Sequence, residues 1–200
     1  MKGSLVIVAF FALGVAFGRM GLLPADLGDT GLSFYALCAL MFCVGVGLGS
    51  DPQTLRNFRT LSPRLMLLPL GTLVGTLAGS LLASLLLAHR SAADCLAVGS
   101  GFGYYSLSSI FITEYKGAEL GTVALLANVV REMLTLLLAP FLARWFGPLA
   151  PISAGGATTM DTTLPVILQA SGNRFAVVSV YHGFLMDFSV PFLVTLFCGL

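Results

Sequence analysis

The sequence predicts an all-α polytopic membrane protein, and two observations carry that prediction. Hydrophobic residues make up 57% of the 200 residues and charged residues only 10%, whereas about 25% of an ordinary soluble domain is charged. At roughly 20 residues per span, one transmembrane domain over residues 1–200 holds about five to seven membrane segments. The net charge of +1 says little, because in a membrane protein the position of the charges matters. No basic patch indicates nucleic acid as a partner.

Three conventional spans come first, and we predict them at residues 4–23, 30–49 and 64–88. The apolar run after Met1 and Lys2 has no clear small-x-small cleavage site. It therefore reads as a first transmembrane helix rather than as a signal peptide. The second and third spans are rich in small residues, which let membrane helices pack closely.

The loop between the second and third spans indicates the orientation of the chain. It is the most polar stretch of the sequence and carries Arg56, Arg59 and Arg64. An excess of arginine in a short loop places that loop in the cytoplasm. We therefore predict a cytoplasmic N-terminus and an external C-terminus.

Two later segments are apolar but interrupted. Residues 92–113 contain three glycines within 99–103, and the segment at 149–168 has Gly, Thr, Asp and Pro residues within 155–165. Non-helical backbone in a membrane must be buried in protein or line water. A pair of such segments indicates the binding site of a secondary transporter. Either both segments re-enter, giving five spans, or both cross, giving seven, and the sequence leaves both topologies open.

The span predicted at 118–145 carries a polar stripe near its middle. Asn128, Arg131, Glu132 and Thr135 are spaced i, i+3, i+4 and i+7, so they share one face of the helix. An ionisable side chain at that depth costs at least about 2.5 to 3.5 kcal/mol, and it usually marks an ion or substrate path. Adjacent residues point about 100° apart, so Arg131 is expected to have another role than pairing with Glu132.

Glu132 and Asp161 are the main candidates for binding substrate and protons. A carboxylate that holds either a proton or an ammonium group, but not both, couples the two species by competition. The structural alternative for Glu132 is a fixed ion pair with Arg131 or a neighbouring helix. For Asp161 the alternative is a helix N-cap within TTMDTTLP.

Other polar side chains of the interrupted segments and of the last span, predicted at 173–198, complete the candidate site. Hydroxyl groups there can hold the carboxylate and amino groups of a zwitterion, although hydroxyls in membrane helices more often bond their own backbone. His182 could relay protons or be a satisfied interior histidine. Asp187 lies roughly 140° around the helix from His182 and receives little weight. The hydroxyl candidates are Ser106, Ser108, Thr159 and Thr162.

Catalytic, redox and metal-binding functions receive little support, and no cofactor is expected. An intramembrane protease could use Ser100 with His182, or Asp161 with Asp187. The sequence, however, has neither a G-x-G-D string nor a recognisable oxyanion arrangement. The cysteines form no C-x-x-C pair and are expected to be small buried hydrophobes. They are Cys38, Cys43, Cys95 and Cys198.

Three ordered motifs resemble the lysine exporter (LysO) family. They are GSGFGYYSLSS (99–109), ANVVREM (127–133) and GGATTMDTTLPV (155–166), followed by His-Gly-Phe at 182–184. The resemblance covers the C-terminal two-thirds of the chain. It implies a bacterial inner-membrane protein that exports L-lysine or close analogues such as thialysine in exchange for protons. It also implies that Glu132 and Asp161 are essential.

The resemblance has one departure, which is length. The usual family chain has about three additional N-terminal spans, so this chain resembles the larger half of a split exporter. The implied fold is an inverted repeat in which residues 64–198 form one repeat and residues 4–49 help to complete the other. The implied partner is a small membrane subunit of about three spans, or a second copy of the chain. An ion-coupled carrier for another amino acid or organic ion is the alternative function.

Overall fold

The computed structural model describes residues 13, 16–20, 46, 63–87 and 89–200. The chain divides into two compact units, Met1–Gly47 and Leu48–Leu200, and most of the described residues belong to the second. Most of the two spans predicted at 4–23 and 30–49, and the loop arginines Arg56 and Arg59, lie outside the described residues. Within the described part every regular element is a helix, which confirms the predicted all-α membrane fold.

Three long apolar helices form the frame of this unit. Among the described residues, these are the helices long and apolar enough to cross a membrane, the third taken together with a preceding 3-10 turn. They match the spans predicted at 64–88, 118–145 and 173–198. In the chain they are α5 (Leu68–Leu86), preceded by α4 (Pro63–Met66), α8 (Ala118–Phe146), and α11 (Ala176–Cys198), preceded by η3 (Asn173–Phe175).

Glycine sets both ends of α8. Gly117 precedes the helix with φ 92° and Gly147 follows it with φ 91°. Positive φ values are readily adopted by glycine alone, so the helix begins and ends where the sequence supplies that residue. The 29 residues between them run without interruption, although Pro140 lies inside the helix.

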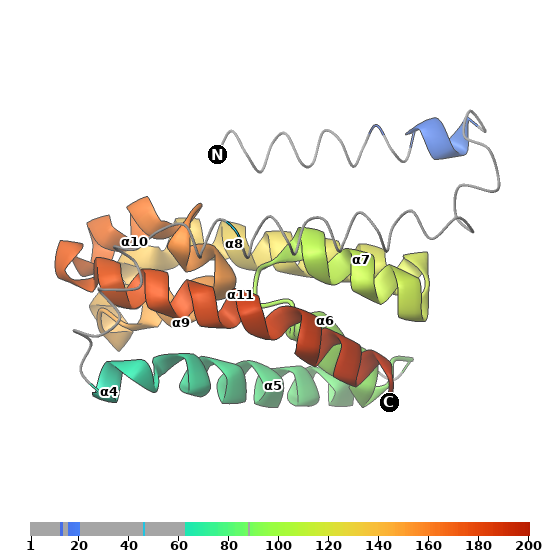
Figure 1. Cartoon of the computed structure of the whole chain (residues 1–200), viewed down its shortest axis with the longest axis horizontal. Coiled ribbons are helices and arrows are strands. Elements are labelled where there is room, and N and C mark those ends of the chain that lie inside the picture. Colours follow the sequence, from blue (N-terminus) through green and yellow to red (C-terminus); the bar gives the residue numbers. More distant parts are fainter. Residues whose placement is uncertain (1–12, 14–15, 21–45, 47–62, 88) are drawn as a thin grey trace. The chain divides into compact units, whose positions relative to one another are not determined.

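The first interrupted segment folds back on itself. It consists of α6 (Ala92–Gly99) and α7 (Tyr105–Lys116), which we call hairpin 1, and its tip is residues 100–104. Asp94 near the start of α6 and Lys116 at the end of α7 form an ion pair at 3.8 Å, so both ends of the hairpin lie together. A second ion pair joins Arg90 to Glu119 at the same place. Hairpin 1 therefore enters and leaves at one end of the bundle (Figure 1), called end B below.

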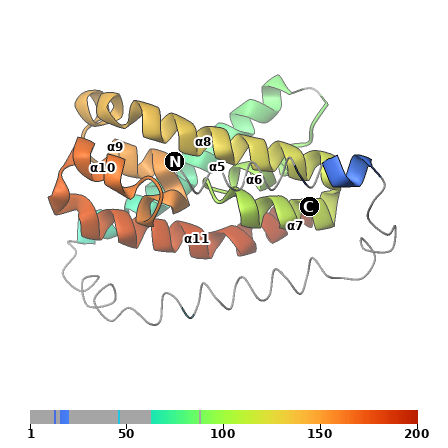
Figure 2. The ribbon, with the colours of Figure 1, turned by 90° about the horizontal axis from the view of Figure 1, so that it is seen from above.

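The second interrupted segment is also a hairpin, and it enters from the opposite end. Hairpin 2 comprises α9 (Ala150–Gly155), η2 (Gly156–Met160) and α10 (Leu164–Ser171), and its tip is residues 156–163. Ile152 of α9, Ile167 of α10 and Val178 of α11 pack in one buried cluster. Leu65 and Leu68 of α4 and α5 lie against this cluster. Helices α5 and α11 therefore begin at the end where hairpin 2 enters, called end A (Figures 1 and 2).

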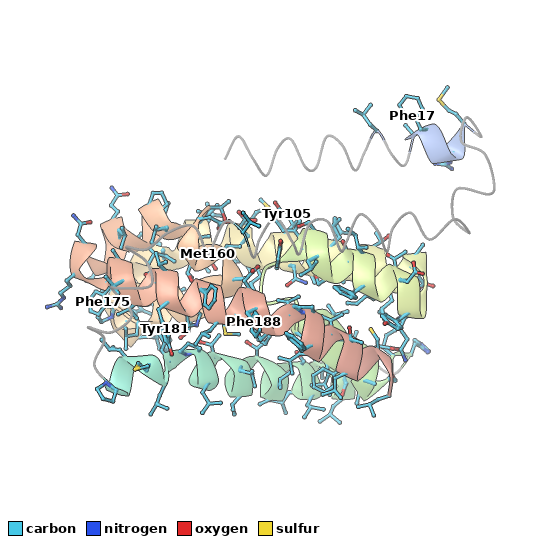
Figure 3. All side chains as sticks on the ribbon, viewed as in Figure 1. Phe17, Tyr105, Met160, Phe175, Tyr181 and Phe188 are labelled. Atoms are coloured by element: carbon cyan, nitrogen blue, oxygen red, sulfur yellow. The ribbon has the colours of Figure 1, made fainter. Side chains whose placement is uncertain are left out.

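The tips of the two hairpins meet in the middle of the bundle. The Ala157 amide donates a hydrogen bond to the Phe102 carbonyl at 2.9 Å, which joins tip 2 to tip 1 directly. Figure 3 shows Tyr105 and Met160, which lie beside the two tips, near mid-length of the unit. Of the two topologies left open by the sequence, the described residues adopt the re-entrant one. The crossing alternative is wrong for these segments because each reverses direction at its glycine-rich break.

Candidate functional site

Tip 1 reverses the chain through two residues with positive φ. Gly103 has φ 92° and Phe102 has φ 45°, an uncommon value for a residue with a side chain. The Phe102 side chain is fully buried, which holds the residue in this conformation. Gly101 has no room for a side chain, because a Cβ there would lie 2.4 Å from Asn128 Nδ2. The glycine cluster in the sequence thus builds a tight turn against α8.

Asn128 of α8 holds tip 1 in place. Its Oδ1 accepts a hydrogen bond from the Gly103 amide at 2.7 Å. Its Nδ2 donates to the Val98 carbonyl at 3.3 Å and to Ser108 Oγ at 3.4 Å, on the two arms of hairpin 1. The first residue of the predicted polar stripe therefore supports the backbone of an interrupted helix, which is a structural role.

Tip 2 depends on the close approach of Gly156 to tip 1. Gly156 has φ 63°, and a Cβ on it would lie 2.1 Å from the Phe102 carbonyl oxygen. After Gly156, threonine hydroxyls stabilise the turn of tip 2. Thr158 Oγ1 and Thr163 Oγ1 lie 3.1 Å apart, and Thr163 Oγ1 donates a hydrogen bond to the Thr158 carbonyl. The glycine is needed where the two tips touch.

Arg131 binds the carbonyl end of α9. Its Nε donates to the Ala154 carbonyl at 2.9 Å and its Nη2 to the Ser153 carbonyl at 3.2 Å. The guanidinium also lies over the Phe102 ring, 5.7 Å from its centroid. These carbonyls carry the partial negative charge of the helix end, so the cation stabilises the break in hairpin 2. The prediction that Arg131 has a role other than pairing with Glu132 fits this geometry.

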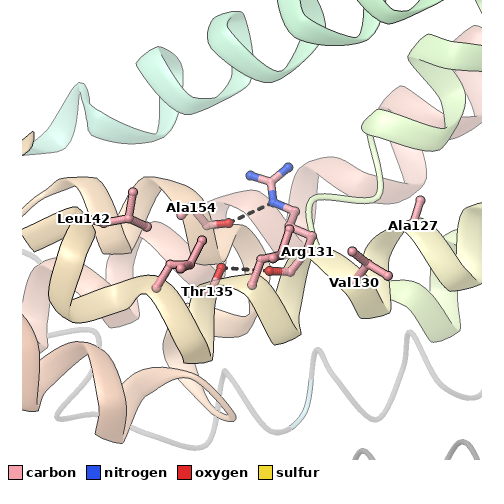
Figure 4. Close-up of a pocket in the computed structure, with 8 residues that line it drawn as sticks. Ala127, Val130, Arg131, Thr135, Leu142 and Ala154 are labelled. Carbon is pink, nitrogen blue, oxygen red and sulfur yellow. Dashed lines mark hydrogen bonds between the residues drawn. The ribbon is translucent and has the colours of Figure 1, made fainter.

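An apolar groove of about 450 Å³ runs along α8 beside Arg131 (Figure 4). Thr135, the last residue of the polar stripe, also lines this groove. Its hydroxyl donates a hydrogen bond to the Arg131 carbonyl at 2.9 Å. The groove is lined by Ala127, Val130, Arg131, Leu134, Thr135, Leu138, Leu142 and Ala154.

Glu132 is buried on the inward face of α8. It is 2% exposed and lies one turn beyond Asn128, on the side of the helix that faces the hairpin tips. Asn128 and Thr135 on the same face are also buried. The stripe predicted from spacing is therefore directed toward the tips, where a carboxylate could meet a substrate.

His182 is a fully buried residue of α11 that bridges three elements. Its Nε2 is hydrogen-bonded to Thr72 Oγ1 of α5 at 2.9 Å, and its Nδ1 lies 3.3 Å from Thr159 Oγ1 of tip 2. Both ring nitrogens thus have hydroxyl partners. This geometry matches the alternative of a satisfied interior histidine.

Asp161 lies in tip 2 and is exposed in the described part of the chain. Its carboxylate accepts hydrogen bonds from the backbone amide and the hydroxyl of Thr162. Helix α10 begins at Leu164 with Thr163 at its N-cap position, so Asp161 is not its cap. The N-cap interpretation is wrong because the chain makes an extra turn between Asp161 and the helix.

The four candidate hydroxyls have different environments. Ser108 Oγ donates to the Tyr104 carbonyl of its own helix start, and Thr159 Oγ1 is bonded to the Gly156 carbonyl of its own turn and to the Ser179 carbonyl of α11. Thr162 bonds Asp161, and Ser106 is half-buried on α7. Thr162 and Ser106 are thus the hydroxyls less engaged with backbone.

Asp187 receives little weight from the sequence, yet in the structure it lies on the part of α11 that packs against tip 2, which carries Asp161. It is 5% exposed on α11 and interacts electrostatically with Asp161. Both carboxylates also act on the Tyr104 side chain in tip 1. Helical spacing from His182 could not reveal this neighbourhood, because tip 2 and α11 meet only in the folded chain.

The pairing proposed for a serine protease is not formed. Ser100 Oγ donates to the Leu96 carbonyl at 2.7 Å, and His182 contacts the threonines named above. Of the cysteines, Cys198 is buried and Cys95 half-buried, while Cys38 and Cys43 lie outside the described residues. In the region the structure covers, no group of three or more His, Cys, Asp or Glu side chains could hold a metal.

Comparison with known proteins gives a consistent set of relatives. The sequence model of a family described as "Lysine exporter LysO" matches residues 8–198. The chain is 34% identical to the lysine exporter LysO of Escherichia coli (strain K12) over 97% of its own length and 64% of that relative. It is 31% identical to a putative lysine exporter of Haemophilus influenzae over 84% of each chain. No solved structure matches it.

Proposed function

Because the chain belongs to the lysine exporter LysO family, we propose that it is a secondary transporter subunit that exports L-lysine and close analogues such as thialysine. We propose proton antiport across the bacterial inner membrane as the coupling. One observation carries the proposal: two helical hairpins enter from opposite ends and meet at Phe102 and Ala157, beside the polar face of α8. Unwound backbone at such a meeting point supplies polar groups for an ion or a zwitterion inside a membrane.

The proposed binding groups suit a cationic amino acid. Lysine carries two ammonium groups and one carboxylate, and we assign its ammonium groups to Glu132 and Asp161. The N-terminal turn of α7 has no side-chain cap among the described residues, so its amides, near Ser106, suit the carboxylate. Protonation of the acids on the external side would remove the attraction for the ammonium groups and release lysine. Return of the protons to the cytoplasm would reset the site.

The distribution of charge supports an orientation with end A in the cytoplasm. Arg144 lies in the last turn of α8 and Arg174 in η3, both at end A, and neither forms an ion pair with an acidic side chain of the described residues. At end B the cations Arg90 and Lys116 are paired with acids. An excess of arginine on one side marks the cytoplasmic side. Hairpin 2 then opens to the cytoplasm and hairpin 1 to the exterior.

We propose that the working transporter contains further helices. The chain covers 64% of the length of the Escherichia coli relative. Residues 64–198 contain three spans and two hairpins, which suits one repeat of an inverted-repeat fold, with residues 4–49 contributing to the other. A small membrane subunit of about three spans, or a second copy of this chain, would complete it. Membrane lipid covers the remaining apolar faces.

The experiment is labelled-lysine flux in vesicles that contain this chain, with and without a candidate small subunit, under an imposed proton gradient. Glu132→Gln and Asp161→Asn are near-isosteric, so we expect each to abolish flux while the protein stays in the membrane. Glu114→Gln changes an exposed acid at end B and serves as the matched control. Flux that survives both changes refutes the mechanism. Flux driven by a sodium gradient, or by another amino acid or organic ion, would favour the alternative carrier.

A further inference from the structure

A carboxylate outside the proposed pair is buried without a stabilising partner. Asp187 is 5% exposed, and within the described residues no hydrogen-bond donor and no basic side chain contacts it. A charge that is largely withdrawn from water is unfavourable unless a cation or a proton accompanies it. The position therefore calls for a positive partner that this part of the chain does not supply.

The packing of α11 brings Asp187 close to tip 2. Gly183 of α11 abuts tip 2 so closely that a Cβ there would lie 2.7 Å from the Met160 amide nitrogen. Asp187 is one turn further along the same face of the helix, and Asp161 directly follows Met160. Figure 3 shows Phe188, the residue after Asp187, near mid-length of α11. This contact, which only glycine permits, thus places the residue before Asp161 one helical turn from Asp187.

The surroundings of these two carboxylates favour an organic cation over a metal ion. Each acid interacts electrostatically with Tyr104, an aromatic residue whose hydroxyl has no hydrogen bond to the described residues. Aromatic rings and carboxylates together suit an ammonium group. A hard divalent cation would need about six to eight oxygen ligands.

We propose that Asp187 is a further substrate-binding residue, which holds a primary ammonium group together with Asp161 between tip 2 and α11. This inference rests on the proposed function, which assigns Asp161 to the substrate. The ligand class is an amino acid or an amine with a primary ammonium group on an unbranched carbon chain. In the absence of substrate, a proton or a water-bound monovalent cation would occupy the position.

The test measures binding to the full chain in detergent, with its small subunit where one is required, by the shift in melting temperature. The probes are L-lysine, 1,5-diaminopentane and norleucine, which lacks the terminal ammonium group. Asp187→Asn removes the charge and Asp187→Glu keeps it. Glu114→Gln is the control. We expect Asp187→Asn to weaken lysine binding by about tenfold or more, since a charge-assisted hydrogen bond is lost, and Asp187→Glu to retain part of it.

The outcomes separate this inference from the function on which it rests. Lysine that stabilises wild type and Asp187→Asn equally would overturn the role of Asp187 and leave the exporter proposal standing. A second outcome is that diaminopentane raises the melting temperature of the wild type but not of Asp187→Asn, while lysine changes neither. This result would support the ammonium site and refute lysine as the substrate. If no ammonium compound stabilises the wild type, the inference is overturned. Circular dichroism of each variant checks that it folds.

Discussion

Replacing Gly156 by alanine is expected to destabilise the contact between the two hairpin tips. Gly156 has φ 63°, a value that a residue with a side chain adopts only under strain, and a Cβ on it would lie 2.1 Å from the Phe102 carbonyl oxygen. That oxygen also accepts the 2.9 Å hydrogen bond from Ala157 that joins the tips. The substitution therefore combines backbone strain with a clash against main chain.

A matched control separates these two effects. Gly172, at the end of α10, has φ 101°, and a Cβ there would meet nothing within 4 Å. Backbone strain of this kind costs about 1 to 3 kcal/mol at either glycine. The clash adds about 1 to 3 kcal/mol of overpacking, and loss of the hydrogen bond about 0.5 to 1.5 kcal/mol. Gly156→Ala should therefore lower the free energy of unfolding by about 1.5 to 4.5 kcal/mol more than Gly172→Ala.

The measurement is unfolding by sodium dodecyl sulfate in mixed micelles, followed by far-ultraviolet circular dichroism. Lysine flux should fall for Gly156→Ala and stay near the wild-type level for Gly172→Ala, because the second residue is remote from the tips. Equal destabilisation by the two variants would show that the tips do not pack as closely as described. It would remove the structural basis for placing the site there.

Three further predictions concern the residues that hold the hairpins. Asn128→Ala should raise hydrogen–deuterium exchange across residues 98–104 and lower stability by about 2 to 3 kcal/mol, because buried polar groups lose their partner; unchanged exchange would contradict the assigned contacts. Arg131→Lys keeps the charge but cannot reproduce the forked contact with two carbonyls, so flux should fall severalfold, and wild-type flux would argue against this role. Asp94→Asn breaks a long, partly exposed ion pair with Lys116, at 3.8 Å, and should change stability by less than about 1 kcal/mol; a larger loss would mean that this pair closes hairpin 1.

Much of the site's position could be read from the sequence because its signals are local. Three glycines within residues 99–103 predicted a break in the helix, and tip 1 lies at this position in the structure. The spacing of the polar stripe on α8 fixed which of its side chains share a face, and Asn128 and Glu132 are buried on it. Propensity, periodicity and hydropathy act over a few residues, so a single sequence records them.

No local signal determines the end at which each interrupted segment leaves the bundle. The sequence therefore allowed both crossing and re-entry. The ion pair between Asp94 and Lys116 and the cluster around Ile152 and Ile167 settle it, because they join residues that are distant along the chain. For the same reason the sequence did not reveal that Asp187 lies on the part of α11 that packs against tip 2.

By itself, then, the sequence determined an all-helical membrane protein with two interrupted segments and a polar stripe, since apolar composition and helical period are properties of neighbouring residues. Only the tertiary structure decided that the interruptions are opposed hairpins, that Arg131 and Asn128 support their backbones, and that Asp161 and Asp187 share one neighbourhood. Contacts between distant segments depend on the packing of whole helices, which no local pattern encodes.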